Sequence, residues 1–246
     1  MKLPPGHRVQ HFERIDSTNA EARRLAEAGE QGPLWIWSDE QTGGRGRLGR
    51  TWVSEPGNLY ATYLFQTAAP VNAAAQISFV AAVAVHDLAS QLLPKSHVVL
   101  KWPNDALIEG AKFCGLLAEV VSTNPTRIAL GCGINLAHAP NGTPYPVTAL
   151  GVHFTPAAVL EKLAPTLWNW VKIWDEGRGF AAIREAWLER AAGVGQDVWV
   201  DDTVGRFDGI ASDGAMLVTF SNGAQKSVHA GEIRFAGIEK LRSGKI

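Results

Sequence analysis

The sequence of 246 residues has no excess of either charge, since 23 lysines and arginines stand against 24 aspartates and glutamates. This balance gives no support to a protein that binds nucleic acid through bulk electrostatics. Only two cysteines are present, Cys114 and Cys132, without C-x-x-C spacing and inside apolar runs. We expect them to be buried free thiols, which suits a reducing cytoplasm better than secretion.

Targeting and membrane signals are also missing. The first ten residues, MKLPPGHRVQ, contain no apolar signal-peptide core, and we expect no segment of membrane-spanning length. At this length, with 46% hydrophobic and 19% charged residues, the chain can bury a sizeable core as one large domain or a main domain with a small one. These features predict a folded cytoplasmic protein that contacts neither DNA nor a membrane.

Common nucleotide-binding signatures fail as well. There is no G-x-x-x-x-G-K-[ST] loop, and the kinase triplets H-R-D and D-F-G do not occur. Gly44-x-Gly46-x-x-Gly49 fits the G-x-G-x-x-G pattern, but a β-like run follows it where the dinucleotide fingerprint needs a helix. We therefore interpret this match as a coincidence, and a nucleotide would have to be held in another way.

Glycine and arginine are concentrated in the segment Gly43–Trp52, GGRGRLGRTW, which we call the Gly/Arg loop. Its glycines give it backbone freedom and little to bury, so alone it is predicted to be mobile. Arg45, Arg47 and Arg50 are hydrogen-bond donors with fixed positive charge. The loop is thus predicted to order around a phosphate or carboxylate, with Trp52 available to stack on a flat ring.

The periodicity predicts an α/β (α+β) protein in two domains, residues 1–193 and 194–246. Strands are expected at 8–15, 34–38, 59–65, 98–101, 106–108, 112–121 and 127–136, and helices from Thr18 to Gly29 and at 72–93, 156–174 and 180–191. Residues 137–151 show no periodicity and are expected to be a loop. Past Gly195, short strands with Asp-Gly and Asn-Gly turns predict a small all-β unit.

Two short stretches allow more than one interpretation. Thr18 and Glu21 have the spacing of a capping box, so Ser17 and Thr18 either only cap a helix or also face a ligand. Asp105, which ends Lys101-Trp102-Pro103-Asn104-Asp105, is by itself a typical turn-capping carboxylate. Lys112 is by itself a typical solvated lysine beside a hairpin turn, although the apolar run after it would hold its stem along a buried strand.

The order of these motifs resembles that of the biotin protein ligases, over about residues 10 to 140. The matching elements are Ser17-Thr18-Asn19, Gln41, the Gly/Arg loop, Lys101–Asp105 with Lys112 and Gly115, and Gly131-x-Gly133-Ile134-Asn135. A weaker match continues to Ala230-Gly231-Glu232-Ile233. The resemblance implies a mixed-sheet catalytic domain of the biotin/lipoate ligase type, followed by a small C-terminal β-barrel.

The resemblance implies an enzyme that uses ATP and Mg²⁺ to make biotinyl-5′-AMP and then transfers biotin to a lysine of a biotin carboxyl carrier domain. Both steps develop negative charge, so fixed cations should supply most of the catalysis. Because the chain starts almost at the first strand of the catalytic domain, we expect no DNA-binding repressor function. The resemblance does not decide between a monomer and a homodimer.

Carried over residue by residue, the resemblance implies three groups of site residues. The biotin-binding set is Ser17, Thr18, Asn19, Gln41, Arg45, Arg47, Lys112 and Gly115, of which Ser17, Thr18 and Gln41 would bind the ureido ring. The ATP-binding set is Arg45, Arg47, Arg50, Trp52, Asn104, Lys112 and Asn135, with Trp52 on the adenine and Asn135 and Asn104 at its edge. Arg47, Lys112 and Asp105 would act in catalysis, Asp105 beside Mg²⁺ or the incoming lysine.

Two rival interpretations stay open. A lipoate–protein ligase or octanoyltransferase shares the catalytic fold and the carrier lysine, but the Gly/Arg loop with Lys101–Asp105 favours biotin. A pure binding module, such as a repressor or an RNA-binding protein, would use the arginines for nucleic acid, and the near-neutral charge argues against it. Cys114 stands where the family often has a smaller residue, and its reactivity is left open.

Overall fold

The computed structural model describes residues 1–229 and 233–235, and its centre is a seven-stranded mixed sheet. The strand order is β1-β2-β3-β7-β6-β5-β4, in which β1 and β2 are parallel and all other neighbours are antiparallel. The strands are β1 (Arg8–Ile15), β2 (Leu34–Gln41), β3 (Leu59–Gln66), β4 (Val98–Lys101), β5 (Asp105–Ile108), β6 (Ala111–Thr123) and β7 (Thr126–Ile134). Each of the strands expected in residues 1–136 is confirmed, with ends moved by a few residues.

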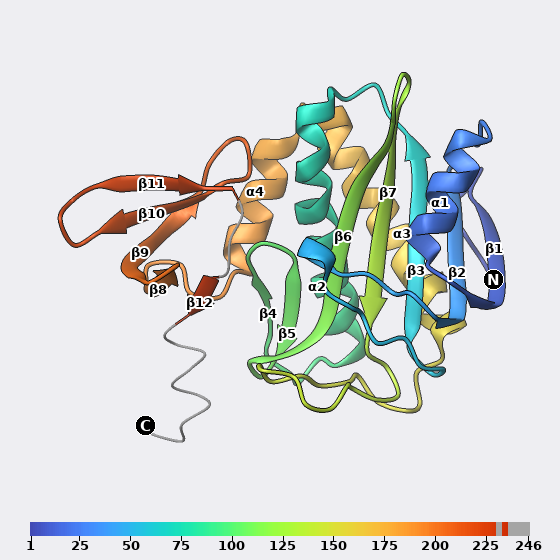
Figure 1. Cartoon of the computed structure of the whole chain (residues 1–246), viewed down its shortest axis with the longest axis horizontal. Helices are drawn as coiled ribbons and strands as arrows, with labels where there is room; N and C mark the ends of the chain where they lie inside the picture. Colours follow the sequence, from blue (N-terminus) through green and yellow to red (C-terminus); the bar gives the residue numbers. More distant parts are fainter. Residues whose placement is uncertain (230–232, 236–246) are drawn as a thin grey trace.

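Helices cover both faces of this sheet (Figure 1). One face carries α1 (Thr18–Glu27), and the other carries α2 (Ile77–Leu92) and α3 (Pro156–Trp174). Helix α4 (Phe180–Glu189) packs on α2, α3 and the second sheet described below. Side chains of the central strands point alternately to the two faces, and those that point to α2 are apolar and form the main core with it. The α1 side has room for the Gly/Arg loop, which crosses the sheet there in Figure 1.

The start of α1 differs from the predicted capping box by one residue. Ser17, not Thr18, is the N-cap: its backbone is extended, and its hydroxyl accepts a long hydrogen bond of 3.5 Å from the N–H of Ala20. The side chain of Glu21 pairs instead with Arg24 at 2.7 Å. This shift frees the Thr18 side chain from the capping function.

The apolar segment expected as one helix at 72–93 begins as a 3₁₀ helix, η2 (Val71–Gln76), and continues as α2. Together they have the length and hydropathy of a membrane-spanning helix, so the expectation that no segment is long enough was wrong. However, 67% of the most apolar window is buried inside the protein. That degree of burial is typical of a core helix.

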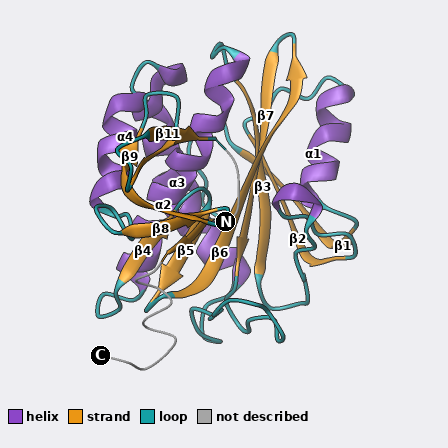
Figure 2. Cartoon of the chain, turned by 60° about the vertical axis from the view of Figure 1, so that its left-hand side comes forward, coloured by secondary structure: helices purple, strands orange, loops and turns teal. Residues whose placement is uncertain are grey.

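Residues after Gly195 form a second, five-stranded antiparallel sheet (Figures 1 and 2). Its order is β11-β10-β9-β8-β12, with β8 (Asp197–Val200), β9 (Thr203–Ile210), β10 (Met216–Phe220), β11 (Gln225–Val228) and β12 (Ile233–Phe235). The expected barrel is therefore an open sheet in the part of the chain that is described, since β11 and β12 are its unjoined edges. Of the expected last-strand motif, 230–232 lie outside the described residues, and Ile233 begins β12.

Strand β4 is bonded to the segment that leads from α4 to the small sheet, and the turn after β4 is bonded to the small-sheet unit itself. The backbone of Leu100 exchanges hydrogen bonds with Arg190 and Ala192, 2.8 Å each, and Trp102 Nε1 donates to the carbonyl of Gly214 at 3.3 Å. The apolar side chains of both sheets belong to one continuous cluster. The turn after β4 is thereby held by both units, which matters because it forms one wall of the candidate site.

Asn58 fastens the chain that leaves β7. Its side chain is 1% exposed, and its Oδ1 accepts hydrogen bonds from the N–H groups of Leu136 and Ala137 at 2.8 and 2.9 Å. Its Nδ2 donates to the carbonyl of His138 at 2.9 Å. One buried amide thus satisfies several backbone groups at the start of the 137–151 loop.

We predict that Asn58→Ala lowers the free energy of unfolding by about 1–3 kcal/mol, because buried backbone donors lose their acceptor. Urea denaturation measures the change. Asn141→Ala, at an exposed position of the same loop, is the matched control and should leave the midpoint unchanged. Equal midpoints for both variants would contradict the assignment.

Candidate active site

A cavity of about 670 Å³ opens on the α1 face of the large sheet. It collects, from six separate segments, nearly all the residues that the sequence singled out. These are Ser17, Thr18, Asn19, Gln41, Arg45, Arg47, Arg50, Trp52, Asn104, Asp105, Lys112 and Gly115. The fold therefore brings the motifs together, although they span almost a hundred residues of sequence.

The Gly/Arg loop forms its own short antiparallel ladder over this cavity. The N–H of Trp52 donates to the carbonyl of Gly44 at 3.0 Å, and that of Gly46 to Arg50 at 2.7 Å. At the tip, Leu48 has a left-handed backbone (φ 55°) and is 72% exposed. These bonds give the loop a defined path over the cavity, and its mobility in the absence of an anion stays a prediction.

Trp52 anchors the end of the loop on the sheet. Gly115 in β6 and Gly133 in β7 are direct neighbours in the register, and the indole lies on both. A Cβ on Gly115 would lie 2.8 Å from Trp52 Cζ3, and one on Gly133 would lie 2.6 Å from Cε2. The indole Nε1 is buried there with no hydrogen-bond partner in the described chain. Only glycine at both positions leaves room for the indole to lie on the two strands.

Lys112 lies beside this indole, at the other wall of the cavity. Its Nζ is 2.7 Å from Asp105 Oδ1 and faces the rings of Trp52 and Tyr145, whose centroids are 5.3 and 5.5 Å away. The backbone of Lys112 is bonded on both sides to the 137–151 loop, through Pro146 and Thr148, at 2.9 Å each. With a side chain only 14% exposed, Lys112 is a positioned cation rather than a solvated one.

Arg47 supplies a second cation at the same end. It is half-buried; burial lowers the pKa of its guanidinium, and the charge of Asp105 partly offsets this effect. Arg45 and Arg50 are exposed. Within residues 1–229 and 233–235, none of these three arginines forms an ion pair. An arginine remains charged in any such setting, so the cavity end is strongly attractive to anions.

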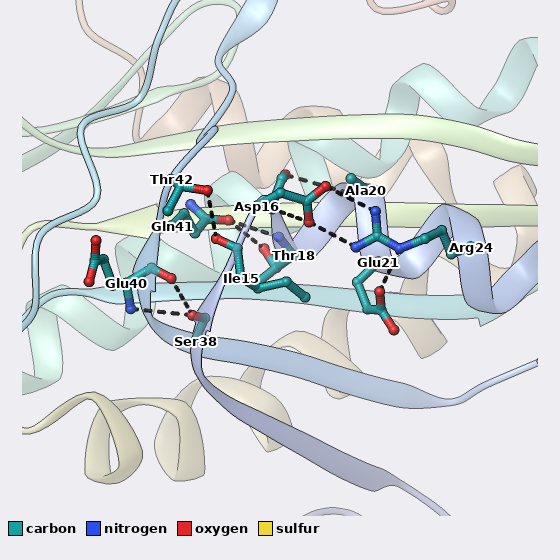
Figure 3. Close-up of polar contacts among 11 residues, drawn as sticks. Ile15, Asp16, Thr18, Ala20, Glu21, Arg24, Ser38, Glu40, Gln41 and Thr42 are labelled. Atoms are coloured by element: carbon teal, nitrogen blue, oxygen red, sulfur yellow. Dashed lines mark hydrogen bonds and ion pairs between the residues drawn. The ribbon is translucent and has the colours of Figure 1, made fainter.

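The opposite end of the cavity is neutral and polar. Gln41 Oε1 accepts from the N–H of Thr18 at 2.8 Å and lies 3.1 Å from Thr18 Oγ1 (Figure 3). Because a backbone N–H can only donate, the oxygen of this amide must face Thr18. Its Nε2 donates to Ser54 Oγ at 2.9 Å, and Ser54 donates to the carbonyl of Trp52 at 2.9 Å. The polar end is thus connected to the base of the loop.

An ion pair secures the turn that presents this end (Figure 3). Arg24 binds both carboxylate oxygens of Asp16, at 2.8 and 2.9 Å, and these bonds lower the pKa of Asp16 to about 2. The carbonyl of Asp16 accepts from Gly43 at 2.8 Å. The strand-to-helix turn and the start of the Gly/Arg loop are therefore held to each other.

The structure does not place Asn135 in the cavity. Its side chain is 2% exposed, and its Nδ2 donates to the carbonyl of Thr148 at 3.1 Å. Asn135 thus holds the 137–151 loop, and its expected role at a ligand stays a prediction. Asn104 does line the cavity, and its amide donates to the carbonyl of Leu116 at 2.6 Å, so one of its two N–H groups is already used.

Several lining or adjoining residues had no signal in the sequence. Tyr145 comes from a loop without periodicity, and the small sheet adds Asp201, Asp202 and Phe235 to the rim, beside Ile233 of the expected last-strand motif. Thr62 and Ser54 lie behind Thr18 and Gln41 as buried partners. No motif spacing could have found them, because each is defined by a contact between distant segments.

Both cysteines are buried free thiols, as expected. Burial raises the pKa of Cys132 to about 12 and that of Cys114 well above its usual range. Both therefore stay protonated at neutral pH, and a protonated thiol is a poor nucleophile. Among the residues described, there is also no group of three or more His, Cys, Asp or Glu side chains that could hold a metal ion.

We predict that Gly115→Ala displaces the Trp52 indole, because the new methyl group would overlap the ring. Hydroxyl-radical oxidation of Trp52, read by mass spectrometry, should rise in this variant. Gly46→Ala is the matched control, since its Cβ would meet nothing closer than 3.5 Å. Unchanged oxidation of Trp52 in Gly115→Ala would show that the indole does not rest on this glycine.

Comparison with known proteins agrees with this geometry. The model of the biotin/lipoate A/B protein ligase family matches residues 11–135. A biotin–[acetyl-CoA-carboxylase] ligase of Paracoccus denitrificans is 39% identical over 91% of this chain and 99% of its own length. The bifunctional ligase/repressor BirA of Bacillus subtilis is 27% identical over 90% of this chain and 72% of its own length.

The fold has solved counterparts as well. A biotin protein ligase from Aquifex aeolicus, in complex with biotin and ATP, superimposes with a TM-score of 0.77. It is 24% identical, and the match covers 93% of this chain and 99% of that one. Given the family match, the full-length relative and this common fold, the chain belongs to the biotin/lipoate A/B protein ligase family, among its biotin protein ligases.

Proposed function

We propose that this protein is an ATP-dependent ligase that activates biotin as biotinyl-5′-AMP and transfers it to a lysine of a biotin carboxyl carrier domain. The observation that carries the proposal is the polarity of the cavity: unpaired arginines and Lys112 at one end, neutral hydrogen-bonding groups at the other. Biotin has the complementary polarity, with a carboxylate on one side and a ureido ring on the other. The Paracoccus relative, named for biotin, favours biotin over lipoate.

At the polar end, Ser17, Thr18 and Gln41 offer both donors and acceptors to a ureido ring. The hydroxyl of Ser17 is scarcely used by its 3.5 Å capping bond, and Gln41 Nε2 keeps one N–H after bonding Ser54. Asn19 supports the same end from behind. A purely apolar ring system, such as the dithiolane of lipoate, would leave these groups without partners at a cost in binding free energy.

At the cationic end, a carboxylate oxygen of biotin forms a bond to the α-phosphorus of ATP while the bond to pyrophosphate breaks. Lys112 and Arg47 face the oxygens on which negative charge accumulates, in a setting where water is partly excluded. Arg45 and Arg50 hold phosphates, and Trp52 covers the adenine. The ion pair of Lys112 with Asp105 keeps the ammonium in place until the anionic substrates arrive.

In the second step, the neutral amine of the carrier lysine attacks the carbonyl carbon of the adenylate, an amide bond forms, AMP leaves with the electron pair of the broken C–O bond, and the amine loses one proton to water. Asp105 is placed beside Lys112 to accept a hydrogen bond from the incoming amine. Mg²⁺, when bound, would neutralise phosphate charge. Asp105 is the carboxylate beside Lys112, while Asp201 and Asp202 lie at the rim, and this sparse donor set fits an ion carried mainly by the substrate phosphates.

We propose two domains, residues 1–193 and 194–246, in which the small sheet of the second domain supports the rim of the cavity. Its Asp201 and Asp202 are the acidic residues that it contributes to the cavity. Two buried free thiols suit a reducing cytoplasm, where we place the protein. The direct test of function is incubation with biotin, MgATP and a carrier domain, followed by mass measurement of the carrier. No mass increase on the carrier lysine would contradict the proposal.

We predict that Lys112→Ala reduces biotin-dependent ATP–pyrophosphate exchange by about 10²–10³, the effect of losing one well-placed electrostatic donor. Biotin affinity, measured by calorimetry, should change much less. Lys95→Ala, an exposed lysine outside the cavity, is the control and should exchange normally. Near-normal exchange by Lys112→Ala would remove Lys112 from the chemistry.

We predict that Arg47→Gly releases the adenylate into solution, because the half-buried guanidinium no longer holds the phosphate. Released adenylate would biotinylate exposed lysines of a bystander protein, which streptavidin blotting detects. Arg14→Gly, which removes an exposed arginine from β1 outside the cavity, is the control for net charge. Labelling confined to the carrier domain in Arg47→Gly would count against retention by this residue.

A further inference from the structure

Behind the polar end of the cavity runs a chain of hydrogen bonds that begins at the partly exposed Glu119 in β6 and continues through buried side chains. Glu119 Oε2 accepts from Asn19 Nδ2 at 2.7 Å. Asn19 Oδ1 lies 2.6 Å from Thr62 Oγ1, which in turn lies 2.8 Å from Thr18 Oγ1. Thr62 is 0% exposed and Asn19 is 5% exposed, so water does not interrupt the chain.

The direction of this chain is set at its Glu119 end. An ionised carboxylate and a peptide carbonyl can only accept, and Asn19 Nδ2 faces both Glu119 and the carbonyl of Leu117. The Asn19 amide nitrogen therefore points to β6, and its oxygen points to Thr62. Arg23, whose Nη2 lies 3.3 Å from the other oxygen of Glu119, helps to hold that carboxylate in place.

Thr62 has a single hydroxyl proton, so it can donate to only one of its two neighbours, Asn19 and Thr18. Asn19 Oδ1 can only accept, so Thr62 donates its proton there, over the shortest distance in the chain. Thr62 Oγ1 is then an acceptor toward Thr18, and the Thr18 hydroxyl proton turns inward to it at 2.8 Å, rather than to Gln41 Oε1 at 3.1 Å.

That arrangement determines what the cavity offers to a ligand. With its proton turned inward, Thr18 Oγ1 presents lone pairs. Gln41 Oε1, which still accepts from the N–H of Thr18, keeps its second lone pair. We propose that Thr62 is a positioning residue that, together with Glu119 and Asn19, makes this end of the cavity an acceptor of ligand N–H groups and so selects a cyclic urea. This inference rests on the proposed function, because the ureido ring of biotin supplies those N–H groups.

The test compares Thr62→Val, which is similar in shape but has no hydroxyl, with the conservative Thr62→Ser. In Thr62→Val, Gln41 Oε1 is the remaining protein acceptor for the hydroxyl proton of Thr18. That proton then occupies the lone pair of Gln41 that would otherwise accept a ligand N–H. We expect the KM for biotin in pyrophosphate exchange to rise about tenfold, the loss of one hydrogen bond, with kcat and the KM for ATP unchanged. Thr62→Ser should keep the wild-type KM. An N-methylated biotin, which lacks one ureido N–H, should lose less affinity on the change Thr62→Val than biotin does.

A second variant tests the direction of the chain without removing a side chain from the core. Glu119→Gln can donate as well as accept, so only the longer bond to the carbonyl of Leu117, 3.3 Å, still favours one orientation of Asn19, and the KM for biotin should rise severalfold. Glu185→Gln, at an exposed position of α4, is the control. Wild-type KM values in both Thr62→Val and Glu119→Gln would overturn the inference. Absence of biotin-dependent exchange in the wild-type protein would instead overturn the proposed function, so the two failures are distinguishable.

Discussion

The site depends on a close approach between the Gly/Arg loop and the sheet, which only glycine permits. Antiparallel register places Gly115 opposite Gly133, so two neighbouring strands lack a Cβ at the same point of the α1 face. The Trp52 indole fills that space, and through it the loop reaches Lys112. A shift of register by one residue would put side chains under the indole and move the loop away from the cavity.

Because the Gly/Arg loop lies so close to the sheet, positive charge is concentrated at one end of the cavity, and the described residues do not fully neutralise it. Arg47 is half-buried without an ion pair, and the indole N–H of Trp52 is buried without a partner. Both arrangements cost stability relative to a fully paired site. Local violations of the rules for polar burial are expected at functional sites, where a ligand supplies the missing partners. Asp105 moderates the cost by pairing with Lys112, so that one cation is already fixed in position.

The sequence predicted the strands of the large sheet well, because alternating or short apolar runs bounded by glycine and proline are local signals. It also predicted which motifs meet, since their order resembled a known family. It did not predict the N-cap at Ser17, because Ser17 and Thr18 are both good caps and the tertiary contact of Thr18 with Gln41 decides between them. The contacts of Thr62 and Tyr145 and the bond from Asn135 to Thr148 could not be predicted, because each depends on a pairing of distant segments.

Polar and cationic functions are separated along the cavity, and the separation has a structural cause. The cations come from the Gly/Arg loop and the start of β6, which the indole and the 137–151 loop position. The neutral groups come from the α1 turn and the end of β2, and their hydrogen-bond direction is set from behind by Glu119, which lies further along the same strand as Lys112. In the proposed reaction, strand β6 therefore contributes a positive charge near the reacting groups and a fixed hydrogen-bond acceptor behind the end that would bind the ureido ring. Substitutions at its two ends should accordingly affect different quantities, turnover at Lys112 and substrate choice at Glu119.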